Sequence, residues 1–201
     1  MKLNVPEHPF RGYIFDCDGT IADTMPLHYR GWTRTMEELG GRFPEELFYA
    51  WGGTPSWKIV EQLNERFGTK LDVEKTVRLK ERYYKELIPQ VLPIEPVVAL
   101  VKQFYGTAPL AVASGGFQHL VRATLKALDL EGYFDTFVCA EDCVRGKPHP
   151  DPFLEAARRI GVEPEHCLVF EDSPLGIEAA VAAGMQWVLV PTPGQVNQAK
   201  E

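Results

Sequence analysis

The chain has 201 residues, of which 28 are acidic and 21 are basic, so its formal net charge is −7 at neutral pH. The negative charge argues against sequence-independent nucleic-acid binding, and no apolar run reaches the ~18 residues of a membrane helix or has the form of a signal peptide. We therefore expect a cytoplasmic protein with no nucleic-acid or membrane partner. With 45% hydrophobic residues, the chain can bury one core and a smaller inserted unit.

The first predicted element is a buried strand at 12–15, where the sequence reads GYIF. Helical periodicity follows at 25–40, 57–68 and 72–88, with no convincing strand between these stretches. Beyond Pro93, short apolar runs alternate with amphipathic stretches. Strands are expected at 110–114, 134–140, 167–172 and 186–191, and helices at 96–106, 119–130, 152–162 and 175–184. This alternation predicts an α/β fold with a parallel sheet covered by helices on both faces.

The helical segment interrupts this alternation directly after the first strand. We therefore predict two units, an α/β core formed by residues 1–25 and 93–201 and a helical insert formed by residues 26–92. In open α/β sheets, ligands bind at the carboxyl ends of the parallel strands. An insert at this point of the chain is expected to act as a lid over such a site.

Polar and charged residues follow each of the first four predicted strands of the core. In chain order they are Asp16, Asp18, Ser114, Gly115, Lys147, Glu171 and Asp172. Because parallel strands end at one edge of a sheet, these residues are expected to converge there. Crowded carboxylates repel one another unless a cation lies among them, and carboxylate oxygens are ligands that suit Mg²⁺. The sequence predicts a Mg²⁺ site whose ligands come from Asp16, Asp18, Glu171 and Asp172.

The same residues match the needs of phosphoryl transfer. Asp16 can attack phosphorus, and Asp18 can protonate the leaving oxygen and later deprotonate a water. Lys147, Ser114 and the backbone N–H groups near Gly115 suit a phosphate, although Ser114 could also cap the following helix. Glu171 has three open roles: direct contact with the metal, contact through water, or orientation of Lys147.

Four motifs carry a family resemblance: DCDGTIADT at 16–24, VASGG at 112–116, GKPHPDPF at 146–153 and VFEDSPLGIEAA at 169–180. In order and separation they resemble the four motifs of the haloacid dehalogenase-like superfamily of phosphohydrolases. The resemblance implies a Rossmann-like core, a small α-helical cap, Mg²⁺ and an aspartyl-phosphate intermediate. An aspartate at position 18 implies phosphatase or phosphomutase chemistry, because the dehalogenases and ion pumps of the superfamily have other residues there.

The closest resemblance is to the branch that holds β-phosphoglucomutase and the small sugar phosphatases. Mutases carry a lysine and an arginine in the cap loop that here reads WGGTPSWK, at 51–58. Neither cation stands at its place in this chain, so we predict hydrolysis of a small, fructose 1-phosphate-like sugar phosphate. The alternatives are a β-phosphoglucomutase and, from another class, an inactive sugar-phosphate-binding regulator. Every catalytic position is filled, which argues against the regulator.

Four residues are substrate-binding candidates: Thr24 and His28 in the linker to the predicted cap, and Gly53 and Trp57 in the cap loop. In the mutases a histidine at the place of His28 helps to couple lid closure to the acid/base. The alternative for His28 is a surface histidine beside an N-cap threonine. Of Trp51 and Trp57, at least one is expected to pack inside the cap, and the other is a candidate to face the sugar. A monomer is expected.

Overall fold

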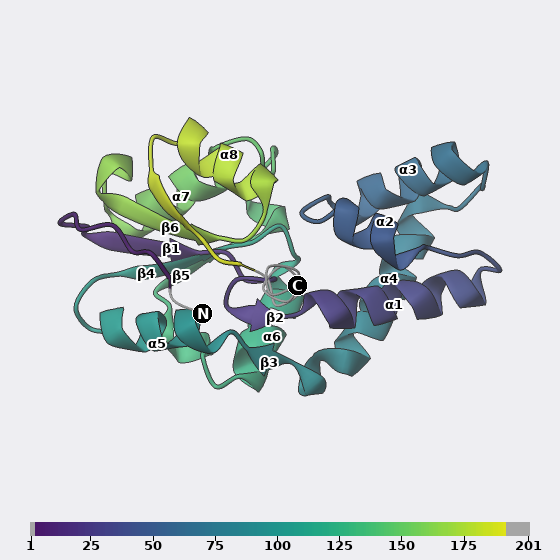
Figure 1. Cartoon of the computed structure of the whole chain (residues 1–201), viewed down its shortest axis with the longest axis horizontal. Helices are drawn as coiled ribbons and strands as arrows, with labels where there is room; N and C mark the ends of the chain where they lie inside the picture. Colours follow the sequence, from purple (N-terminus) through teal and green to yellow (C-terminus); the bar gives the residue numbers. More distant parts are fainter. Residues whose placement is uncertain (1–2, 192–201) are drawn as a thin grey trace, which may run out of the picture. The chain divides into compact units, whose positions relative to one another are not determined.

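The computed structural model describes residues 3–191 of the chain (Figure 1). The chain divides into two compact units, Met1–Asp23 with Leu92–Glu201, and Thr24–Val91. The first is the α/β core and the second is helical.

The core is built on a five-stranded sheet with the order β5-β4-β1-β6-β7. Its strands are β1 (Gly12–Phe15), β4 (Leu110–Ala113), β5 (Thr136–Val138), β6 (Cys167–Glu171) and β7 (Gln186–Leu189). All neighbouring strands are parallel, which confirms the predicted sheet. The strand predicted at 134–140 has only three residues. The carboxylate of Asp142 accepts a hydrogen bond from the backbone N–H of Cys139, and this bond closes a 3₁₀ turn at Ala140–Asp142.

Helices cover both faces of this sheet (Figure 1). On one face, α5 (Glu95–Phe104) and α6 (Gln118–Ala127) pack against the cluster that holds Phe15. On the other, α7 (Asp151–Ile160) and α8 (Pro174–Ala182) pack against the cluster that holds Ile14. Successive side chains of β1 point to opposite faces of the sheet, and helices cover both faces, so Ile14 and Phe15 are both buried. Asp16 follows directly at the carboxyl end of this buried strand.

The helical unit contains α1 (Met25–Glu38), α2 (Glu45–Ala50), α3 (Ser56–Phe67) and α4 (Val73–Leu87). One apolar cluster of this unit holds the buried side chains of Trp32, Met36, Phe43, Phe48, Ile59, Val60 and Leu63. Partly buried residues of α4 pack against it, and α4 also buries Tyr84 and Leu87. The short helix α2 was not predicted, because six residues are too few to show a helical period. Pro44 and the acidic residues of the first turn are the local features that start it.

A two-stranded antiparallel ladder joins the two points where the chain leaves and re-enters the core. It consists of β2 (Ala22–Asp23) and β3 (Leu92–Pro93). Next to it, the N–H of Ile94 donates to the carbonyl of Ile21 at 2.9 Å. The sequence analysis missed this ladder, since two-residue strands leave no periodic signal. Short 3₁₀ turns complete the described elements, at Ile88–Gln90, Glu131–Tyr133 and Pro164–His166. Within residues 3–191, no helix has the length and apolar character needed to cross a membrane.

Candidate active site

The carboxyl ends of β1, β4 and β6 lie side by side because these strands are neighbours in the sheet. Phe15 at the end of β1 pairs with Val112 of β4 and with Phe170 of β6. The next residue, Asp16, donates its N–H to the carbonyl of Phe170 at 2.9 Å. The backbone of the sheet therefore places Asp16 beside the predicted residues at the ends of β4 and β6.

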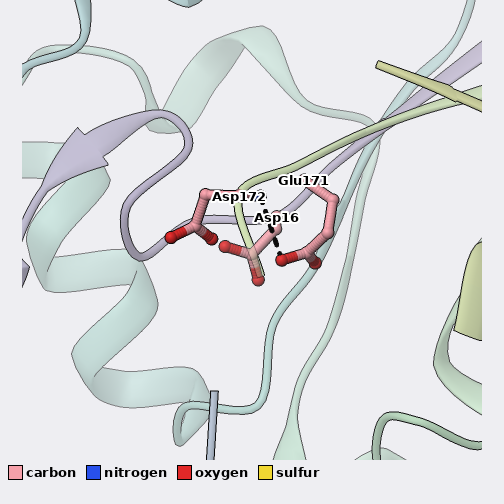
Figure 2. A group of neighbouring side chains, drawn as sticks. All are labelled: Asp16, Glu171 and Asp172. Carbon is pink, nitrogen blue, oxygen red and sulfur yellow. Dashed lines mark hydrogen bonds between the residues drawn. The ribbon is translucent and has the colours of Figure 1, made fainter. Parts of the chain in front are cut away.

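Three carboxylates gather at this edge. Asp16, Glu171 and Asp172 each offer an oxygen, and these three atoms lie within 4.8 Å of one another. Figure 2 shows their side chains grouped at the strand ends. Asp18, the fourth predicted ligand, is not part of this group among the described residues. The donor set consists of hard oxygen ligands, which fits Mg²⁺ better than a softer metal.

Lys147 connects two of the carboxylates. Its Nζ donates to Oδ1 of Asp16 at 2.7 Å and to Oε2 of Glu171 at 2.6 Å. The lysine side chain is only 10% exposed, and it lies over the ring of Phe153 at 4.9 Å. A buried ammonium with two carboxylate partners is a fixed charge rather than a solvated one.

The electrostatics of the group indicate an excess of negative charge. Burial, with repulsion from Glu171, raises the pKa of Asp16 to about 7, although Lys147 acts in the opposite direction. Burial and repulsion from Asp16 and Glu171 raise the pKa of Asp172 to about 9. Burial also opposes ionisation of Glu171, but Lys147 and Ser173 outweigh it and hold its pKa below the usual value. One lysine does not balance three carboxylates, so a second cation would fit here.

Asp18 lies on the Ser114 side of the site. The hydroxyl of Ser114 donates to Oδ2 of Asp18 at 3.4 Å and accepts from the N–H of Gly116 at 3.0 Å. Ser114 therefore does not cap α6. That helix starts after Phe117, and the N–H of Gln118 donates to the carboxylate of Glu141. Ser114 and Gly115, which follow β4, thus lie beside Asp18, which follows β1. Their roles as phosphate-binding and acid/base groups stay predictions.

Gly19 holds the turn that separates the two aspartates from β2. Its φ is +86°, a left-handed conformation that favours glycine. A Cβ at this position would also lie 2.8 Å from Cγ of Asp172, closer than real Cβ atoms approach other atoms. The glycine is thus needed twice, for the backbone conformation and for the approach of Asp172.

We expect the Gly19→Ala variant to lose at least about tenfold in phosphate release, because the added methyl group displaces Asp172. Gly161→Ala is the matched control. Gly161 has a similar φ of +69°, but a Cβ there would meet no atom within 4 Å. Both variants should lose about 1–2 kcal/mol of stability from backbone strain. Steady-state kinetics and thermal unfolding of the two proteins test this, and equal activity losses would contradict the role of the Asp172 contact.

The remaining candidate residues belong to the helical unit. Thr24 is the N-cap residue of α1, without a side-chain cap bond. The ring of His28 stacks on Tyr84 with centroids 3.9 Å apart, and its Nδ1 lies 3.0 Å from Nζ of Lys80. His28 therefore belongs to a packed cluster, not to a bare helix surface. Its role toward the substrate stays a prediction.

The two tryptophans of the cap loop differ in environment. Trp51 packs against the core of the helical unit, with its ring 5.5 Å from that of Phe43. Trp57 on α3 is 52% exposed, and Gly53 in the preceding loop has a φ of +79°. Trp51 is thus the tryptophan that packs. The role of Trp57 and Gly53 in substrate binding stays a prediction.

Three residues of the structure were missed by the sequence analysis. Ser173 and Gly176 surround the carboxylate of Glu171, and Lys80 is a buried lysine, only 6% exposed. The signal for Ser173 was the Ser-Pro pair that starts α8. The signal for Lys80 was its spacing of four residues from the buried Thr76 and Tyr84 on α4, which places it on the apolar face of that helix.

Fold and site together define a class of protein: an α/β protein whose parallel sheet carries three carboxylates and a buried lysine at the carboxyl ends of its strands. The model of one family, described as haloacid dehalogenase-like hydrolase, matches residues 13–190. The chain belongs to this family. The match confirms the predicted Rossmann-like fold and, together with phosphatases among the curated relatives, the predicted enzyme class of phosphoric monoester hydrolases.

Individual relatives support the predicted branch. The chain is 37% identical to the fructose-1-phosphate phosphatase of Escherichia coli, over 89% of this chain and 95% of that protein. It is 33% identical to a phosphorylated carbohydrates phosphatase of Thermotoga maritima, over 86% and 81%. Among solved structures, a β-phosphoglucomutase of Clostridium difficile matches with a TM-score of 0.78 and 26% identity, over 94% of this chain and 88% of that one.

Proposed function

We propose that this protein hydrolyses the phosphate monoester of a small sugar, of the fructose 1-phosphate type, through an aspartyl-phosphate intermediate. The carrying observation is the position of Asp16, which follows β1 with Lys147 at 2.7 Å and two further carboxylates beside it. The similarity to the fructose-1-phosphate phosphatase of Escherichia coli supports the substrate class.

In the first step, an oxygen of Asp16 attacks phosphorus and forms an O–P bond while the bond from phosphorus to the sugar oxygen breaks. Asp18 donates a proton to that oxygen, so the sugar leaves as an alcohol. In the second step, Asp18 takes a proton from a water whose oxygen attacks phosphorus. The bond to Asp16 then breaks, and inorganic phosphate and a free carboxylate result.

Lys147 and Ser114 contribute to both steps through charge and hydrogen bonds. Lys147 is a permanent cation beside the nucleophile, and it reduces the repulsion between the carboxylate of Asp16 and an incoming phosphate. The hydroxyl of Ser114 and the backbone near Gly115 offer donors to the phosphoryl oxygens.

Asp16 and Asp172 are the residues that fit a bound Mg²⁺, with Glu171 beside them and Asp18 as a further predicted ligand. When bound, Mg²⁺ would neutralise charge on the transferring phosphoryl group. The raised pKa values of Asp16 and Asp172 support this assignment, because a cation relieves the repulsion that causes them.

We expect Mg²⁺ affinity to rise with pH, because Asp172, with a pKa of about 9, must lose its proton to bind the ion. If one proton is released when Mg²⁺ binds, the affinity for Mg²⁺ should rise by up to about 100-fold from pH 6 to pH 8. The sign for stability agrees. The pKa of Asp172 is raised in the folded state, so the metal-free protein loses stability as pH rises from the unfolded value of 3.8 toward about 9. Added Mg²⁺ should therefore raise the melting temperature more at pH 8 than at pH 6.

Calorimetric titrations in buffers of different ionisation enthalpy would measure the proton release, and thermal unfolding with and without Mg²⁺ would measure the stabilisation. Removal of divalent cations with EDTA should also stop turnover, and added Mg²⁺ should restore it. Mg²⁺ affinity that is independent of pH over this range would contradict protonated carboxyls at the site.

The first test of the proposed function is phosphate release from a panel of sugar phosphates that includes fructose 1-phosphate and β-glucose 1-phosphate. Hydrolysis predicts free phosphate and no glucose 6-phosphate. The structural similarity to a β-phosphoglucomutase makes the mutase the second candidate. Glucose 6-phosphate from β-glucose 1-phosphate, with little free phosphate, would favour it. A protein that binds sugar phosphates without turnover would instead be the inactive regulator.

A further inference from the structure

Both carboxylate oxygens of Glu171 accept hydrogen bonds from neighbouring donors. Its Oε1 accepts from the N–H of Asp172 at 3.1 Å, from the N–H of Ser173 at 3.0 Å and from the hydroxyl of Ser173 at 2.8 Å. Its Oε2 accepts from Nζ of Lys147 at 2.6 Å. The side chain is buried, with 1% of the residue exposed. One oxygen therefore anchors the carboxylate, and the other presents it to Lys147.

Ser173 links this anchor to the start of α8. It is the N-cap residue of that helix, and its hydroxyl oxygen accepts from the N–H of Gly176 at 3.1 Å. The helix N–H thereby orients the hydroxyl, whose single proton is directed to Oε1 of Glu171. A serine at this place satisfies the helix and the carboxylate at once.

Gly176 makes room for the same carboxylate. A Cβ at position 176 would fall on the side chain of Glu171, closer to its Cδ, Oε2 and Cγ than real Cβ atoms approach other atoms. The backbone of Gly176 is not among the described residues with a positive φ. The glycine is therefore required by the volume that Glu171 occupies, not by backbone conformation.

We propose that Ser173 and Gly176 are positioning residues for the phosphoryl transfer, which fix Glu171 and, through it, hold Lys147 against Asp16. This rests on the proposed function. To stay in place, Lys147 requires a carboxylate oxygen at the position that Oε2 of Glu171 now occupies. Position 176 can supply that oxygen, because its Cβ would fall where the carboxylate of Glu171 now lies, and the carboxylate of an aspartate is one bond from its Cβ.

The test compares wild type with Glu171→Ala, Gly176→Asp and the double variant Glu171→Ala/Gly176→Asp. Each single variant is expected to lose about 10–100-fold in kcat, because one lacks the carboxylate and the other displaces it. The double variant should recover at least about tenfold over Glu171→Ala. Gly176→Asp would thus lower kcat when residue 171 is glutamate and raise kcat when residue 171 is alanine. A merely structural role does not produce this reversal of sign.

The ¹⁵N–¹H signal of the Lys147 ammonium group gives a readout besides activity. Slow exchange with solvent reports the two carboxylate partners of this buried group. The signal should broaden in Glu171→Ala and sharpen again in the double variant. If wild type releases no phosphate from any sugar phosphate, the proposed function fails, while this signal still tests the positioning of Lys147.

Two smaller changes keep the proposal testable if the double variant does not fold. Ser173→Ala should lower kcat about tenfold, and Ser173→Thr should restore it, because the hydroxyl is what both partners need. Gly176→Ala should lower kcat and broaden the Lys147 signal. Its control is Gly132→Ala, since a Cβ at Gly132 would meet no atom within 4 Å. Wild-type kcat and an unchanged Lys147 signal in Gly176→Ala would overturn the proposal, as would the same loss from Gly176→Asp in both backgrounds.

Discussion

The Asp16→Asn variant is expected to release phosphate on the order of 10⁴–10⁶-fold more slowly than wild type. An amide cannot form the O–P bond of the proposed intermediate, so this loss should appear in kcat for every substrate. The geometry at the end of β1 should persist, because the amide oxygen can still accept from Lys147, as Oδ1 of Asp16 does at 2.7 Å.

The same variant separates chemistry from stability. Asp16 is buried and its pKa is raised to about 7, so its charge is unfavourable in the metal-free fold. Replacement by a neutral amide should leave the metal-free melting temperature unchanged or higher. The control is Asp129→Asn, an exposed position with a φ of +57° that asparagine tolerates as well as aspartate. Phosphate release by Asp16→Asn at more than a tenth of the wild-type rate would contradict Asp16 as the nucleophile.

The core of the fold was predictable because its strands have apolar runs that are buried on both faces. GYIF at 12–15 matches β1 residue for residue, and the parallel neighbours of that strand follow from the alternation of strands and helices. The carboxyl ends of such strands must meet at one edge. For this reason Asp16, Ser114 and Asp172 could be placed together before their distances were known.

What the sequence did not show depends on individual contacts across the fold. No periodic pattern reveals that Oε1 of Glu171 accepts from Ser173, or that Gly176 leaves room for that carboxylate. Glu171 had three open roles for the same reason. The contact of its Oε2 with Lys147 at 2.6 Å is one that only the tertiary structure supplies. A helix pattern is recognised over about 11–18 residues and a strand pattern over about 4–8, so the six-residue α2 and the two-residue strands β2 and β3 are too short to predict.

The Asp18→Asn variant is expected to stop at the aspartyl-phosphate stage with p-nitrophenyl phosphate as substrate. Nitrophenolate leaves without a proton, so the first step should proceed without an acid. The second step needs a base to take the proton of the attacking water, and an amide at position 18 cannot do so. We expect a burst of one equivalent of nitrophenolate and then turnover about 10²–10⁴-fold below wild type. Intact-protein mass spectrometry would detect the phosphorylated chain.

Fructose 1-phosphate should give no burst with this variant, because its sugar oxygen is a poor leaving group unless Asp18 protonates it. The contact between Asp18 and the hydroxyl of Ser114 at 3.4 Å should persist with asparagine, so the difference between substrates would report the proton and not a displaced loop. Asp129→Asn serves again as the isosteric surface control. A burst of equal rate with both substrates would remove Asp18 as the acid. Steady turnover of p-nitrophenyl phosphate at the wild-type rate would remove it as the base. The two substrates thus test separately the two proton transfers that the second aspartate is proposed to perform.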